Sequence, residues 1–181
     1  MSVVIGKDKL SFRNYIDVAC NKLKVELADE AKTRITNARK TVENIVENDK
    51  VVYGVTTGFG SLRNKFIDKE DVVTLQRNLI RSHAIGSGNS SPDYIVRAMM
   101  LHRLQCICNG NSGVRLEVAN TLVEALNKNF IPCVPERGTV GASGDLAPLS
   151  FMVLSLMGEG LAYDKDTKSF TDSSKVLEKL N

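Results

Sequence analysis

The chain has 181 residues, of which 24 are Lys or Arg and 21 are Asp or Glu, so the formal net charge is only +3. A charge this small gives no reason to expect binding to nucleic acid or to a membrane surface, and 6% aromatic residues without tryptophan argue against a base-stacking platform. With 43% apolar and 25% charged residues, the composition is typical of a soluble globular protein. The length is consistent with one domain over residues 1–181.

Several sequence features indicate a cytoplasmic protein. Residues 1–15 contain no sustained apolar stretch and no small-residue cleavage site, so we expect no signal peptide. The longest nearly apolar run, 146–157, is short for a bilayer span. No C-x-x-C pair occurs, which argues against a metal site, and we expect buried thiols in a reducing compartment. The cysteines are Cys20, Cys106, Cys108 and Cys133.

The first half of the chain predicts three helices. Ser11 is a suitable N-cap for the first. Apolar residues recur every three or four positions over 27–46, which predicts a long second helix. Glycines and β-branched residues mix in 51–62, which predicts a short strand that runs into a tight loop. Asp68 is expected to cap a third helix that ends near Ser82.

The second half predicts further helices and a polar tail. Ser91 and Pro92 are typical of a helix start, and Gly110 of its end. Ser112 is expected to open the next helix. An irregular stretch then leads to an almost uncharged helix at 146–158, which should be buried nearly all round. A short hairpin and a final helix complete a mainly α chain with a few short strands.

The glycine-rich segment 138–149 reads GTVGASGDLAPL. A serine-hydrolase elbow would need glycine where Asp145 stands, and no phosphate-binding pattern is present. One plain interpretation is a turn ahead of a helix capped by Asp145. Another uses the backbone itself: the Gly144 nitrogen attacks the Ala142 carbonyl, and loss of water with dehydration of Ser143 leaves an electrophilic alkylidene imidazolone. Small residues suit such a compressed loop.

Residues 138–149, with the helix that ends in MGEG at 157–160, resemble the signature of the aromatic amino acid ammonia-lyases. The resemblance implies a 4-methylidene-imidazol-5-one group that forms autocatalytically from Ala142, Ser143 and Gly144, without a metal. It also implies the N-terminal prosthetic-group domain of that fold, without the family's long central helix bundle.

Residues 53–60 read YGVTTGFG and resemble a second segment of the same family. On its own, Tyr53 is most simply a half-buried tyrosine with a hydrogen-bonded hydroxyl. The resemblance implies that Tyr53 is the catalytic base that removes a β-proton from the substrate. A phenol is a weak base at its ordinary pKa of about 10, so this role needs positive charge or hydrogen-bond donors nearby.

Residues 75–84 resemble the family's helix that leads into the ring-binding pocket. The pair Ser82-His83 resembles the histidine-specific members, whereas tyrosine and phenylalanine lyases carry other pairs there. The resemblance implies that Ser82 and His83 bind the substrate, with His83 near its imidazole. The alternative is a histidine that is merely stabilised by the dipole at a helix C-terminus. We expect His102 to be structural.

The implied reaction is elimination of ammonia from L-histidine to give trans-urocanate, in a cytoplasmic homotetramer. Family enzymes are much longer, and this chain ends before their later active-site residues, so we expect residues 1–181 alone to be inactive. The alternatives are a lyase or 2,3-aminomutase for another aromatic amino acid, a non-catalytic truncated domain with an exposed apolar patch, and a helical domain without the prosthetic group.

Overall fold

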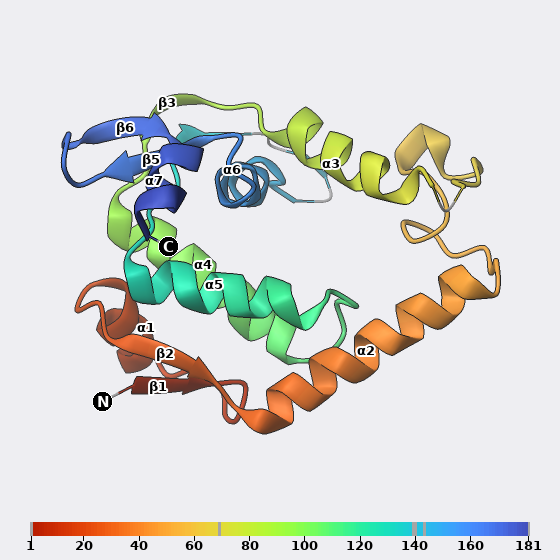
Figure 1. Cartoon of the computed structure of the whole chain (residues 1–181), viewed down its shortest axis with the longest axis horizontal. Coiled ribbons are helices and arrows are strands. Elements are labelled where there is room, and N and C mark those ends of the chain that lie inside the picture. Colours follow the sequence, from red (N-terminus) through yellow and green to blue (C-terminus); the bar gives the residue numbers. More distant parts are fainter. Residues whose placement is uncertain (1, 69, 139–140, 143, 181) are drawn as a thin grey trace.

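The structure is a computed structural model that describes residues 2–68, 70–138, 141–142 and 144–180 (Figure 1). Its helices are α1 (Phe12–Ala19), α2 (Asp29–Glu47), α3 (Val72–His83), α4 (Asp93–Cys108), α5 (Leu116–Lys128), α6 (Ala147–Leu156) and α7 (Ser173–Leu180), with a 3-10 turn η1 (Gly60–Leu62). Its strands are β1 (Ser2–Ile5), β2 (Lys24–Leu27), β3 (Ser87–Ser90), β4 (Pro135–Arg137), β5 (Leu161–Asp164) and β6 (Ser169–Asp172). The predicted class, mainly α with a few short strands, is confirmed.

The N-terminus forms a parallel pair of strands that the sequence does not predict. β1 pairs with β2 in register from Ser2–Lys24 to Ile5–Leu27, and α1 is the crossover between them. Alternate residues of both strands are buried. The predicted start of the long helix is therefore wrong, since Leu27 ends β2 and α2 begins at Asp29. Pairing with β1 overrides the helical spacing that Leu27 shares with Ala31.

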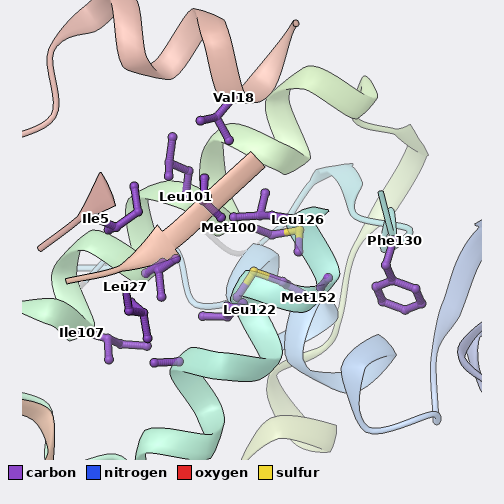
Figure 2. Close-up of a cluster of buried hydrophobic side chains, with 14 of the residues drawn as sticks. Ile5, Val18, Leu27, Met100, Leu101, Ile107, Leu122, Leu126, Phe130 and Met152 are labelled. Carbon is purple, nitrogen blue, oxygen red and sulfur yellow. The ribbon is translucent and has the colours of Figure 1, made fainter. Parts of the chain in front are cut away.

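Helix α4 is the centre of the hydrophobic core. It contacts α1, α2, α5 and β1. Figure 2 shows Met100 and Leu101 of α4 among side chains from these neighbours, including Ile5, Val18 and Leu122. Met100, Leu101 and Leu104 are completely buried. The core therefore lies where α4 is enclosed by the β1–α1–β2 unit on one side and α5 on another.

A completely buried arginine joins three parts of this core. Arg97 of α4 donates two hydrogen bonds to the carbonyl of Val18, at 3.1 and 2.8 Å. It also donates to the Leu126 carbonyl at 3.0 Å and to Asn129 Oδ1 at 2.9 Å. Burial lowers the pKa of Arg97, against the opposing charge of Asp93. These bonds satisfy the ends of α1 and α5 inside the protein.

The helix ends agree in part with the prediction. Ser11 caps α1 in a reciprocal capping box with Asn14, as expected. Gly110 follows α4 with a φ of +78°, in the region that favours glycine. The cap of α3 is Asp71, not the predicted Asp68, and α5 begins at Leu116, beyond the predicted Ser112. Residues 70–71 form a turn before α3, and residues 111–115 before α5 are irregular with a bend at Ser112, so both helices start later.

The structure overturns two expectations about burial. Only Ala147, Met152 and Ser155 of α6 are buried, because α3 and α7 cover limited parts of this helix. Cys20 is exposed, since it lies at the C-cap where the chain leaves α1. Cys108 is buried, which raises the pKa of its thiol to about 11. In the described ranges, no helix combines the length and apolar character needed to cross a membrane.

The C-terminal region is a hairpin with a helix bound to it. β5 and β6 pair antiparallel from Leu161–Asp172 to Asp164–Ser169, and α7 follows at once, so the predicted hairpin and final helix are confirmed. Lys179 of α7 donates to Asp164 at 2.7 Å and to Asp166 at 2.8 Å. These bonds lower the pKa of Asp164 and raise that of Lys179. They fix α7 to the turn of the hairpin.

Candidate functional site

The Tyr53 segment forms a loop that is closed by buried threonines. Residues 51–62 contain no strand, so that prediction is wrong. Thr56 and Thr57 are buried, and the Thr56 hydroxyl donates to the Lys50 carbonyl at 2.6 Å. The backbone returns through an isolated bridge between Thr57 and Phe66. The threonines satisfy backbone groups that a strand would have paired, so they shape the loop as expected.

Tyr53 lies on the outside of this loop. Its side chain is 62% exposed and makes an edge contact with the ring of Phe59, with 5.9 Å between centroids. The backbone N–H of Gly60 donates to the phenol oxygen at 3.4 Å. A side chain at Gly54, where φ is +72°, would come within 3.0 Å of the Phe59 ring. The expectation of a half-buried tyrosine is wrong, and the phenol is accessible.

Ser82 and His83 lie at the C-terminal end of α3. The Ser82 hydroxyl donates to the Leu79 carbonyl at 2.9 Å. His83 Nδ1 lies 2.8 Å from the same carbonyl and 3.1 Å from Ser82 Oγ. A carbonyl can only accept, so Nδ1 of His83 carries a hydrogen and donates it to Leu79. The sequence-predicted pair is thus a local unit in which both side chains are bonded to the Leu79 carbonyl.

His102, in contrast, has a structural partner. Its Nδ1 lies 2.8 Å from the Tyr15 hydroxyl, and the two rings are 6.2 Å apart. Burial raises the pKa of Tyr15, and the nearby Cys106 adds to the effect. This contact joins α1 to α4, as a structural role requires.

Gly138 and Ala147, at the two ends of the segment 138–147, lie close together. A side chain at Gly138 would approach the Ala147 Cβ to 2.8 Å and Asp145 Oδ1 to 3.0 Å, so only glycine fits there. Asp145 Oδ1 accepts from the Ala147 N–H at 3.3 Å. Asp145 therefore binds the first turn of α6, although Leu146 is the N-cap residue. The predicted role of Asp145 is correct in kind and displaced by one residue.

Two of the three predicted ring-forming residues, Ala142 and Gly144, are among the described residues. Ala142 is exposed. Gly144 has a φ of +114°, and its N–H donates back to the Gly141 carbonyl at 3.2 Å. Among the described residues, no atom lies within 4 Å of the Cβ position of Gly144. Ser143 lies outside the described residues.

These observations fit an imidazolone formed from the backbone. The loop is pinned at both ends by Gly138 and Asp145, it is exposed at Ala142, and its glycine adopts a conformation that side-chain-bearing residues avoid. The residues described here that would hold the group are therefore Ala142 and Gly144.

An ion pair that the sequence does not predict joins the C-terminal end of α3 to the residues after α6. Arg81 donates through Nε to Glu159 Oε2 at 2.7 Å and through Nη2 to Glu159 Oε1 at 2.8 Å. Glu159 belongs to the MGEG end of the recognised signature. No helical spacing links residues so far apart in the sequence, and only the packing of α3 on α6 reveals the pair.

The structure brings the candidate residues together only in part. A side chain at Gly86, just after α3, would approach the Phe151 ring of α6 to 3.0 Å, and β3 pairs with β4. The residues after His83 therefore contact both α6 and β4, the two elements on either side of the segment 138–146. Tyr53 lies in its own loop, and no hydrogen bond or ring contact between described residues joins it to His83 or Gly144.

Known proteins are similar to this chain in both sequence and fold. The chain is 49% identical over 160 residues to a histidine ammonia-lyase of Alkaliphilus oremlandii, which covers 88% of this chain and 32% of that protein. A histidine ammonia-lyase from Trypanosoma cruzi has 36% identity and a TM-score of 0.89, covering 99% of this chain and 34% of that one. The ergothioneine-degrading enzyme of Treponema denticola has 30% identity and a TM-score of 0.93, covering 99% and 36%.

The chain thus spans about a third of the length of the curated relatives that it matches. The family described as aromatic amino acid lyase matches residues 10–181, which includes both glycine-rich loops and the Arg81–Glu159 pair. The match covers almost the whole chain, and the protein belongs to the aromatic amino acid lyase family.

Proposed function

We propose that the protein is the N-terminal part of a histidine ammonia-lyase, which releases ammonia from L-histidine and gives trans-urocanate. The observation that carries the proposal is the 45–49% identity to curated histidine ammonia-lyases over most of the chain. The Ser82–His83 unit is consistent with L-histidine as the substrate. Nδ1 of His83 is bonded to the Leu79 carbonyl, which leaves Nε2 to meet the imidazole of the substrate. Residues 1–181 alone are proposed to be inactive.

We propose a role for each candidate residue on the basis of the family resemblance. Ala142, Ser143 and Gly144 form the 4-methylidene-imidazol-5-one group, which supplies the electrophile that common side chains lack. Tyr53 takes the β-proton, and its exposed phenol can reach a substrate. His83 and Ser82 orient the imidazole ring. Holding base, electrophile and substrate at fixed distances provides much of the rate advantage.

We also propose that the whole protein is a cytoplasmic homotetramer. Free thiols are consistent with a reducing compartment. Large apolar side chains are exposed around the candidate site, which is typical of a surface that another chain or domain covers. They include Val51, Leu62, Phe66, Val73 and Ile85.

Intact mass spectrometry tests the prosthetic group first. The purified chain, and a version extended to the length of the relatives, are compared with their calculated masses. A deficit of two water molecules, mapped to the peptide that contains Ser143 and absent in Ser143→Ala, is the expected result. An unmodified extended protein would overturn the proposal.

Turnover tests the catalytic roles in the same extended protein. We expect ammonia and urocanate from L-histidine, with Tyr53→Phe lowering turnover by about a hundredfold or more while the mass deficit persists. Tyr94→Phe is the matched control, because Tyr94 is also exposed and lies on α4. Retention of nitrogen in a β-amino acid would instead identify a 2,3-aminomutase, an activity that several similar structures are named for.

A further inference from the structure

Helix α3 ends in the residues proposed to bind substrate, yet it is poorly anchored. None of its residues is buried, and the helix it packs against is α6. A helix held by so little apolar contact is expected to move on its support. Substrate recognition needs the opposite, because a small displacement of a binding group costs much of its effect.

The Arg81–Glu159 contact supplies a defined attachment at this end. The two hydrogen bonds run side by side from one guanidinium to one carboxylate, so they fix orientation as well as distance. The bond to Glu159 raises the pKa of Arg81, and the bond to Arg81 lowers the pKa of Glu159. Both groups therefore stay charged at neutral pH.

Glu159 is itself fixed by a backbone hydrogen bond to α6, and its neighbour Gly160 by hydrogen bonds to Ser173. Its N–H donates to the Leu154 carbonyl of α6 at 3.1 Å. The next residue, Gly160, accepts from the Ser173 N–H at 2.9 Å, and its own N–H donates to Ser173 Oγ at 3.2 Å. Glu159 is thus joined both to α6 and to the start of α7, and Arg81 is bound to a part of the chain with a fixed geometry.

We propose that Arg81 and Glu159 are a positioning pair, which fixes the C-terminal end of α3, and with it the imidazole of His83, on α6. Arg81 directly precedes Ser82, and α6 directly follows the loop 138–147. The pair therefore sets His83 relative to the helix that the loop leads into. The proposal rests on the proposed function only for the statement that His83 meets the substrate.

Nuclear magnetic resonance tests the positioning in the chain as it is. The sequence has only two histidines, so the imidazole Cε1–H spectrum contains two signals, and His102, which is bonded to Tyr15, reports on the contact between α1 and α4. We expect Arg81→Ala and Glu159→Gln to shift or broaden the His83 signal and to leave the His102 signal in place. A His83 signal that superimposes on the wild-type signal in both variants would overturn the proposal.

Matched variants separate positioning from a general effect of charge. Arg77→Ala removes an exposed arginine one turn earlier, whose influence on Glu159 is only that of a nearby charge, so the His83 signal should not move. The exchange Arg81→Glu with Glu159→Arg should restore the wild-type signal. Because the pair is 49% and 35% exposed, added salt should shift the His83 signal in the wild type but not in Arg81→Ala.

Kinetics in the extended protein then link the pair to the substrate. Arg81→Ala should raise the KM for L-histidine about tenfold or more, with a smaller change in kcat, because the chemical groups stay in place. The mass deficit of the 138–147 peptide should be unchanged. An unchanged KM in an active protein contradicts the inference alone, whereas a wild type without deficit or turnover contradicts the proposed function and leaves the resonance result standing.

Discussion

Helices α3 and α4 are of similar length but have opposite environments. α4 has buried residues from Val96 to Cys108 and lies at the centre of the core, whereas α3 has none and rests on α6 (Figure 1). Stability therefore depends mainly on α4, whereas the candidate binding residues lie on α3. Binding elements are commonly drawn from the less stable parts of a fold. His83 is then held by polar contacts, and the core holds the frame.

Truncating one side chain in each helix tests whether α4 contributes more than α3 to the free energy of unfolding. Leu104→Ala in α4 should lower the free energy of unfolding by about 2–5 kcal/mol, because it leaves a cavity in a closely packed core. Val73→Ala in α3, where the side chain is 60% exposed, should change it by less than about 0.5 kcal/mol. Urea denaturation followed by circular dichroism measures both. Equal losses would show that α3 shares the core.

The buried arginine offers a second test of how the core is held. Arg97→Met should cost about 2–4 kcal/mol, because the carbonyls of Val18 and Leu126 lose their partner and stay buried. Arg13→Met is the control, since the Arg13 side chain is 75% exposed in an ion pair with Asp17. Denaturation curves of the two variants decide the point, and a near-neutral Arg97→Met would mean that packing alone positions α1 and α5.

The smallest effect is expected at α7, through pH. The pKa of Asp164 is lowered in the folded protein, so its contribution is complete above the ordinary aspartate value of about 3.9 and is lost as the pH falls through the lowered value. The pKa of Lys179 is raised, so its contribution is complete below about 10.4 and is lost as the pH rises through the raised value.

Hydrogen exchange of α7 across these two ranges measures the effect. Protection should decrease at the acid end in the wild type and should show no such acid step in Asp164→Asn. Asp172→Asn is the control, because the Lys175–Asp172 pair is exposed and spans only three residues. An acid step that persists in Asp164→Asn would assign the attachment of α7 to other groups.

Much of the fold could be predicted from the sequence because local signals carry it. The capping box at Ser11 and the glycine after α4 mark helix ends directly. The β1–β2 pair could not be predicted, since each strand has four residues and pairs with a partner beyond a helix. Leu27 satisfies the helical spacing and the strand pattern equally, and only the position of β1 decides between them.

For the candidate site, the identity of the residues could be predicted from the sequence but their positions in space could not. Tyr53, His83 and the Ala142–Gly144 segment could be singled out because glycine-rich loops and a family signature mark them. Their placement could not, because it depends on contacts between distant segments. No local sequence pattern predicts the contact between Arg81 and Glu159. Tyr53 is exposed because its segment forms turns, although its sequence favours a strand.

The parallel β1–α1–β2 unit has a consequence for how the chain emerges from the ribosome. Its strands are complete after residue 27, but its apolar face is covered by α4 and α5, and the β2 backbone at Val25 is bonded to Asn127 at 2.8 and 2.9 Å. About a hundred further residues must therefore be synthesised, over several seconds, before this face is covered. During that interval the apolar face of the β1–α1–β2 unit has no partner from α4 or α5.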